Sequence, residues 1–120
     1  RSMVIAQRLV RRLCPHCRQK TGEHTDLPRS VWPQQLPRWQ PAGCERCYHG
    51  FYGRVSIFEV LAIDNPLRQA IASGAGTEVI EASARQAGLI SLFEHGCMAV
   101  EQGMTTLEEL VRVLGMPDGC

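Results

Sequence analysis

The feature that most constrains this chain is a pair of short cysteine motifs, CPHC at residues 14–17 and CERC at residues 44–47. Each motif can wrap a turn whose backbone N–H groups point at sulfur, so that four thiolates surround one Zn²⁺ tetrahedrally. The 26 residues between the motifs exceed the ~15 to 20 of the commonest zinc-binding spacing, but the closure entropy grows only logarithmically with loop length. The sequence therefore predicts a closed, structural zinc site with the ligands Cys14, Cys17, Cys44 and Cys47.

Other chemistry for these four cysteines stays open on spacing alone. Disulfide bonds within or between the motifs are one alternative, although nothing in the sequence indicates export to an oxidising compartment. A thioredoxin-like redox centre needs one C-x-x-C at a strand-to-helix junction, whereas rubredoxin-type iron would use the same four ligands. His16, His24 and His49 are available as substitute ligands, but four cysteines already complete a site.

The other two cysteines are not expected to bind metal. Six cysteines in 120 residues is a lower density than that of a small domain held together by disulfides. Cys97 lies on the apolar face of a predicted helix and is expected in the core. Nothing suggests a partner for Cys120 at the chain end.

The composition is that of an ordinary globular domain. Hydrophobic residues make up 44% of the chain and charged residues 21%, which argues against a disordered tail, a coiled coil or a fibre. No apolar run approaches the ~18 residues that a membrane-spanning helix needs. Residues 1–13 carry four arginines where a secretory signal would have its apolar stretch. We therefore expect a soluble unit without an export signal.

The net charge of +1 conceals a division near residue 54. Residues 1–54 carry ten Lys or Arg and three acids, giving +7, whereas residues 55–120 carry three arginines and nine acids, giving −6. The basic half allows the alternative of a free-standing zinc ribbon that binds nucleic acid. This half has few aromatic residues for base stacking and no recognition helix. A metal-dependent hydrolase is disfavoured because four thiolates leave no open position on the metal.

The two halves also differ in their expected secondary structure. Five prolines between residues 15 and 41 predict an irregular, loop-rich first half. Residues 4–13 are predicted as a strand, and residues 54–63 (RVSIFEVLAI) have the pattern of a strand covered on both faces.

From residue 64 onward the sequence predicts helices that begin near residues 64, 77, 91 and 106 and stop at the glycines 74, 88, 103 and 115. Residues 91–94 and 106–109 both match the capping box. The predicted fold class is α+β, in which a loop-rich tetracysteine zinc module is inserted between two short β-strands. A compact bundle of about four short α-helices follows.

Three separated runs resemble the C-terminal end of bacterial type II secretion and type IV pilus assembly ATPases, the general secretion pathway protein E-like family. They are AQRLVRRLCPHC at 6–17, GCERCYHGFYGRVSIFEVL at 43–61 and ARQAGLISLFEHGCMAVEQGMTTLEELVRVLG at 84–115, in the family's order. The resemblance covers nearly the whole chain except residues 20–41. The pilus-retraction branch usually has an Ala-Ile-Arg-Glu motif and no zinc insert, whereas this chain has LRQAIASGA at 67–75. The secretion or pilus-assembly branch is therefore the closer match.

The resemblance implies two parts. Residues 1–63 would be a zinc-binding module with flanking strands at the end of a RecA-like ATPase domain, and residues 64–120 an all-α C-terminal subdomain. Zinc would be structural, and ATP with Mg²⁺ would bind only in the parent protein, because Walker A and Walker B segments are absent from this sequence. This fragment is therefore not expected to be an enzyme by itself.

The resemblance also implies partners and a location. The partners would be the rest of the parent ATPase, its hexamer neighbours and an inner-membrane platform protein, with no nucleic acid expected. The location would be cytoplasmic and peripheral at the bacterial inner membrane. Candidate docking residues for the platform protein or anionic lipid are Arg8, Arg11, Arg12, Arg18 and Arg54. The alternative is that these arginines pair within the parent protein or between hexamer subunits.

Overall fold

The computed structural model describes residues 2–117, which form an elongated molecule of 57 × 26 × 20 Å. Its strands are β1 (Ser2–Leu13), β2 (Gln19–Thr25), β3 (Leu36–Gln40) and β4 (Phe51–Ala62). Its helices are α1 (Asn65–Ala72), α2 (Thr77–Gln86), α3 (Leu92–Glu101) and α4 (Leu107–Leu114). The predicted combination of a tetracysteine module with strands and four short helices is confirmed. None of the described helices is long and apolar enough to cross a membrane.

The two predicted strands, β1 and β4, pair as a long antiparallel ribbon in which Val10 faces Val55 and Arg8 faces Ile57. Val10 and Ile57 are fully buried on the face that packs against the helices. Along β4, residues 55–62 are each buried or of intermediate exposure, whereas Leu9 on the partner strand β1 is 43% exposed. The ribbon presents one covered face and one partly exposed face.

The expectation of irregular structure between the cysteine motifs is wrong for residues 19–25 and 36–40, where β2 and β3 form an antiparallel hairpin. Strand β2 reads QKTGEHT and is almost entirely exposed, so it lacks the apolar alternation by which a strand is recognised. Its pairing is interrupted between Lys20 and His24. Leu36 and Trp39 on β3 instead anchor the hairpin by packing on the core.

The helix boundaries follow the predicted caps. Asp64 accepts a hydrogen bond from the Leu67 N–H at 2.9 Å, and Ser91 forms the complete capping box with Glu94. The second capping box is only half formed. The Thr106 hydroxyl accepts from the Glu109 N–H at 3.0 Å, but the Glu109 carboxylate binds arginines instead.

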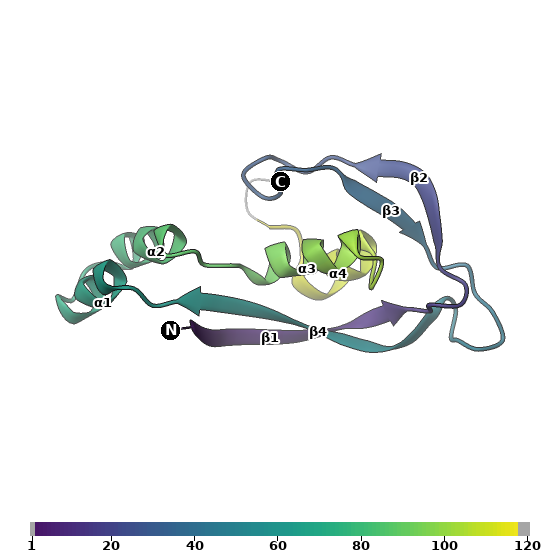
Figure 1. The fold of residues 1–120 in the computed structure, drawn as a ribbon, viewed down its shortest axis with the longest axis horizontal. Coiled ribbons are helices and arrows are strands. Elements are labelled where there is room, and N and C mark those ends of the chain that lie inside the picture. Colours follow the sequence, from purple (N-terminus) through teal and green to yellow (C-terminus); the bar gives the residue numbers. More distant parts are fainter. Residues whose placement is uncertain (1, 118–120) are drawn as a thin grey trace.

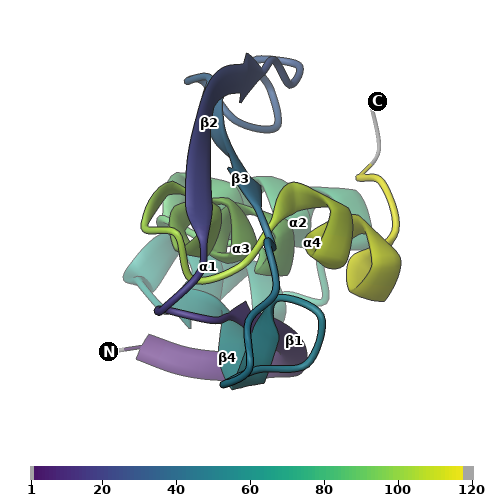
Figure 2. The same cartoon turned by 90° about the vertical axis from the view of Figure 1, so that its right-hand side faces the viewer.

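The helices come as two pairs, α1 with α2 and α3 with α4. Figure 1 shows α1 and α2 at one end of the ribbon, and α3 and α4 between the ribbon and the β2–β3 hairpin. The perpendicular view in Figure 2 shows the same order of layers, with the hairpin above the helices. The core between these layers is formed by buried residues from both halves of the sequence: Val10, Leu36, Ile57, Phe93, Cys97, Val100 and Leu110.

The loop between α3 and α4 binds the end of β1, where the first cysteine motif begins. The Leu13 N–H donates to the Met104 carbonyl at 2.8 Å, and the Thr105 hydroxyl donates to the Arg11 carbonyl at 2.9 Å. Arg18 reaches the same loop through a 2.6 Å hydrogen bond from Nη1 to the Gly103 carbonyl. The helical tail therefore fixes the position of the segment that carries the first two cysteines.

Glu109 completes this attachment from a fully buried position on α4, with 0% of its side chain exposed. Its Oε2 accepts from the backbone N–H of Arg11 at 2.8 Å, and its Oε1 accepts from the Arg11 guanidinium at 2.9 Å. Arg112 donates to both carboxylate oxygens, at 2.7 and 2.8 Å. Burial acts to raise the pKa of Glu109, but the hydrogen bonds from Arg112 and Arg11 outweigh it and lower this pKa to about 2.

Candidate metal centre

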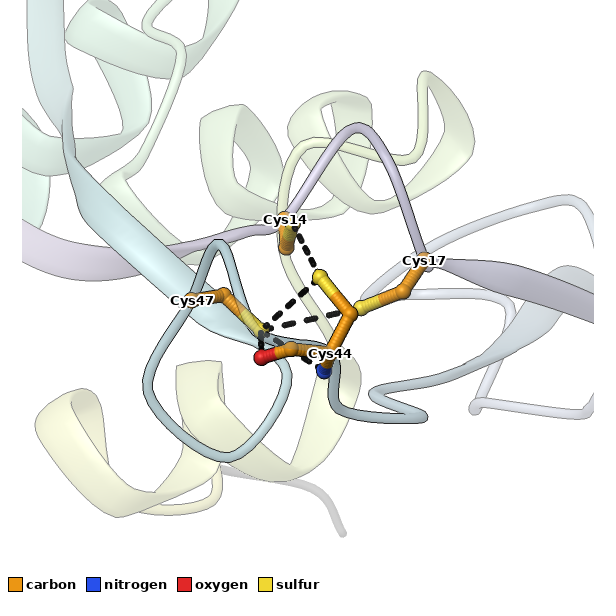
Figure 3. A group of neighbouring side chains, drawn as sticks. All are labelled: Cys14, Cys17, Cys44 and Cys47. Atoms are coloured by element: carbon orange, nitrogen blue, oxygen red, sulfur yellow. Dashed lines mark hydrogen bonds between the residues drawn. The ribbon is translucent and has the colours of Figure 1, made fainter.

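Two turns bring the four cysteines together where β1 ends and β4 begins. The Arg18 N–H donates to the Cys14 carbonyl at 3.0 Å and closes the first turn, and the Cys47 N–H donates to the Cys44 carbonyl at 3.3 Å and closes the second. The Cys14 N–H also donates to the Gly50 carbonyl at 2.9 Å, which ties the first turn to the segment that follows the second. Figure 3 shows the four side chains converging from these two segments.

The spacing of the sulfur atoms fits a tetrahedral metal site. Three Sγ pairs are close: Cys14 and Cys44 at 3.8 Å, Cys17 and Cys47 at 3.7 Å, and Cys44 and Cys47 at 3.7 Å. All four ligand atoms lie within 4.8 Å of one another. Sulfurs bound to zinc at ~2.3 Å at the corners of a tetrahedron are about 3.8 Å apart, whereas a disulfide requires ~2.05 Å. The donor set and its spacing therefore fit one zinc ion.

Backbone N–H groups and burial set the electrostatics of the thiols. The Arg46 N–H points at Cys44 Sγ, 3.4 Å away. Burial acts to raise the pKa of Cys14, but the backbone N–H groups of His16 and Cys17 lower it to about 7. Burial is also the largest influence on Cys17 and raises its pKa to about 12. The four thiols therefore differ in how readily they lose their protons. A metal ion that bound all four sulfurs would release the protons still present.

Gly50 adopts a backbone conformation and a close contact that no other residue type could accommodate. It lies in the 48–51 turn, closed by reciprocal backbone hydrogen bonds between Tyr48 and Phe51 at 2.8 and 3.1 Å. Its φ of +94° belongs to the region that side chains disfavour. A Cβ at this position would also overlap Pro41, with 2.7 Å to the Pro41 Cα. The close passage of the two backbones therefore requires glycine.

Replacing Gly50 by alanine is expected to lower the free energy of unfolding by more than the about 1–3 kcal/mol that a disfavoured backbone conformation costs, because the methyl group also displaces Pro41. Gly22→Ala is the matched control. Gly22 has a φ of +84°, but a Cβ at this position would have no atom within 4 Å, so its substitution should carry the conformational cost alone. Denaturant unfolding of both variants measures the difference; equal losses would show that the contact with Pro41 is unimportant.

Comparison with known proteins identifies the family of this chain. The sequence profile described as "Type II/IV secretion system protein" matches residues 2–112. The chain belongs to this family.

Curated relatives of this secretion-system protein come from both secretion and pilus assembly. The protein transport protein HofB homolog of Escherichia coli K12 is 60% identical over 118 residues, which are 98% of this chain and 26% of the relative. The type II secretion system protein E of Aeromonas hydrophila is 41% identical, over 92% of this chain and 23% of the relative. The type IV pilus assembly ATPase TfpB of Acinetobacter baylyi is 33% identical, over 92% of this chain and 20% of the relative. The chain thus spans about a quarter or less of the length of these relatives.

In this family member the candidate histidine ligands are not part of the group of side chains that could hold a metal ion. Within residues 2–117 the group of possible metal ligands consists of the four cysteines, without His16, His24 or His49. Cys97 is fully buried in the core, as expected. Cys120 lies outside the described residues.

The five candidate docking arginines differ in their surroundings. Arg11 is bound to Glu109, and Arg18 binds the α3–α4 loop and stacks over Trp39, 5.1 Å from the ring centroid. Arg8 donates to the Gln7 carbonyl next to it. The salt bridges of the described residues use Arg11, Arg38 and Arg112 but not Arg8, Arg12 or Arg54.

Sequence reasoning missed two features of this region. The first is Glu109, which the capping-box pattern had assigned to its own helix end; its partner Arg11 is 98 residues away in the chain. The second is a pocket beside the cysteines that includes Arg46 and Tyr52. Neither carries a local sequence signal, because each depends on which segments the fold brings together.

Proposed function

We propose that this chain is the C-terminal zinc-binding and helical segment of a secretion or pilus-assembly ATPase, in which it has a structural and docking role. The observation that carries the proposal is the family match over residues 2–112 together with four thiols whose sulfurs lie within 4.8 Å. Relatives in this family are named as secretion and pilus-assembly proteins. The parent protein would be cytoplasmic and peripheral at the inner membrane.

Zinc would be held by Cys14, Cys17, Cys44 and Cys47 and would act as a structural cross-link. It would join the turn after β1 to the turn before β4, two segments that the hairpin separates in sequence. With four thiolate ligands the metal offers no position for water or substrate, so it would take no part in catalysis. Residues 1–63 would form the zinc-binding part and residues 64–120 the helical part, although both contribute to the core.

ATP hydrolysis is assigned to the rest of the parent protein. We expect the purified chain to show no ATP turnover, because it has no Walker A loop to hold the β- and γ-phosphates. Phosphate release measured with ATP and Mg²⁺ should stay at the level of a buffer blank. Turnover that persists through purification, and that a point substitution in this chain abolishes, would contradict the assignment.

Docking would use three of the five candidate arginines, Arg8, Arg12 and Arg54, which form no salt bridge within residues 2–117 and do not bind the α3–α4 loop. Arg11 and Arg18 make contacts within the chain, so their substitution would disturb the fold. Arg8, Arg12 and Arg54 are exposed and can meet acidic segments of a membrane platform protein, which affects association rate and orientation more than affinity. Hexamer neighbours are the alternative partner.

In the full-length protein, the triple variant Arg8→Glu, Arg12→Glu and Arg54→Glu is expected to keep its hexamers and ATP hydrolysis but to lose secretion or pilus assembly by about tenfold or more. Arg29→Glu, Arg68→Glu and Arg85→Glu form the matched control, since these arginines are also exposed. Size-exclusion chromatography, phosphate release and a secretion or pilus assay measure the three properties. Dissociated hexamers would assign the arginines to the subunit interface instead.

A further inference from the structure

A pocket of about 390 Å³ lies directly beside the cysteine cluster. We call it the knuckle pocket; it is lined by Arg12, Cys14, Pro15, His16, Arg46 and Tyr52. Two guanidinium groups and one imidazole face this space, and no carboxylate is among the lining residues. Such a composition selects a ligand that carries negative charge.

The two arginines of the knuckle pocket are available for a ligand. Among residues 2–117 neither Arg12 nor Arg46 forms a salt bridge. Arg46 contacts His16 across the two turns, with 3.5 Å between Nη1 and Nδ1, which links the two sides of the pocket. A guanidinium group presents a rigid fork of N–H donors that matches the two oxygens of a carboxylate.

Two exposed tyrosines extend the pocket into a larger surface. Tyr52 lines the pocket and stacks on Tyr48 with ring centroids 6.4 Å apart and an interplanar angle of 4°. Tyr48 is 75% exposed and Tyr52 is 56% exposed. Tyrosine and arginine are enriched among the residues that dominate protein–protein interfaces. The stacked rings therefore offer apolar contact area directly beside the charged pocket.

We propose that the knuckle pocket and the Tyr48–Tyr52 pair bind an acidic polypeptide segment, with a carboxylate side chain between Arg12 and Arg46 and an apolar side chain against the tyrosines. This inference deepens the proposed docking role and rests on it, because it names the chemistry of the partner. It also moves the centre of the docking surface from the arginines of β1 to the two cysteine turns.

Two other roles for this surface are less consistent with the structure. A lipid bilayer would call for a broad basic face, whereas two guanidiniums in a concave pocket suit a single side chain. A nucleic acid would need bases to stack on the tyrosines, but these rings stack on each other. The remaining alternative is that the arginines neutralise the charge of the metal site, because zinc with four thiolates carries a net charge of about −2.

The test uses the zinc-loaded chain and a fluorescein-labelled peptide of alternating glutamate and leucine, with binding measured by fluorescence anisotropy. Arg12→Ala with Arg46→Ala is expected to weaken binding by about tenfold or more. Tyr48→Ser with Tyr52→Ser should also weaken it, at unchanged zinc content. Arg29→Ala with Arg68→Ala, two exposed arginines outside the pocket, is the matched control and should bind like the wild type.

Four results would overturn the proposal. Equal binding of a peptide with glutamine in place of glutamate would exclude carboxylate recognition. Loss of zinc in the arginine variant would assign the guanidiniums to the metal site. Displacement of the peptide by phosphatidylglycerol vesicles or by oligothymidylate would identify a lipid or nucleic-acid surface. Absence of peptide binding by a chain that holds zinc and is folded would refute the acidic partner while the structural zinc role stands.

Discussion

Cys14→Ser is expected to abolish zinc binding and to lower the free energy of unfolding by more than about 4 kcal/mol. Cys14 is the fully buried member of the sulfur cluster, and its backbone N–H donates to the Gly50 carbonyl in the segment that follows the second cysteine turn. A structural site that closes the fold contributes its binding free energy to folding. Hydrogen exchange should therefore show loss of protection in residues 14–53 first, and later in the helices.

Zinc content by elemental analysis and the unfolding curve are the direct measurements of this prediction. Cys97→Ala is the matched control, because Cys97 is equally buried but belongs to the core, so this variant should lose stability and keep its zinc. Chelation of the wild-type chain provides a second route that changes no residue. Nitrogen in the first shell by X-ray absorption, or full zinc content in Cys14→Ser, would contradict the assignment. If elemental analysis of the purified protein finds iron and no zinc, the four cysteines form a rubredoxin-type iron site instead.

Glu109→Ala is expected to destabilise the chain by about 3 kcal/mol, because it removes the charge-assisted hydrogen bonds of a buried carboxylate whose partners Arg11 and Arg112 are 48% and 59% exposed. The substitution leaves the Arg11 N–H and two guanidinium groups without their acceptor. It also releases α4 from the end of β1. Glu108→Ala is the control on the same helix. Glu108 is 64% exposed and lies 3.8 Å from Arg38, so its loss should change stability by no more than about 1 kcal/mol.

The pH dependence of stability gives an independent readout for Glu109. Its pKa falls from an ordinary 4.5 to about 2 in the folded protein, so the unfolded state binds the proton more readily. The stabilisation is therefore complete above pH 4.5 and is lost as the pH falls toward 2. A shift of this size corresponds to about 3 kcal/mol. In Glu109→Gln the free energy of unfolding should no longer fall between pH 4.5 and pH 2. An unchanged fall would show that other carboxyl groups cause it.

Features with local signals could be predicted from the residues alone. A capping residue acts on N–H groups two or three positions away, so Asp64 and Ser91 could be identified as caps without knowledge of the fold. The two residues between the cysteines of each motif form a turn, and this turn orients both sulfur atoms toward the same metal position. The meeting of all four sulfurs within 4.8 Å agrees with that expectation, and zinc as their ligand stays a prediction.

The β2–β3 hairpin could not be predicted because its stability comes from elsewhere. Strand β2 is polar along its whole length, and the hairpin is held by Leu36, which belongs to the core cluster, and Trp39, which packs against it. A pattern in the strand itself cannot report such contacts. The five prolines that suggested irregular structure are compatible with the hairpin; the only one within a strand is Pro37 in β3, whose partner β2 is the single neighbour of that strand.

The candidate ligand set, the helix ends and the membership of a secretion-system family could all be inferred from the order of the residues, because they depend on neighbours in the chain or on matched motifs. Which charged side chains form ion pairs or hydrogen bonds within the chain could be learned only from the folded molecule. The fold buries Glu109 between Arg11 and Arg112, holds Arg18 on the α3–α4 loop and leaves Arg12 beside Arg46 in an open pocket. An ion pair depends on distance in space, and residues 98 positions apart meet only after the sheet and the helices have packed.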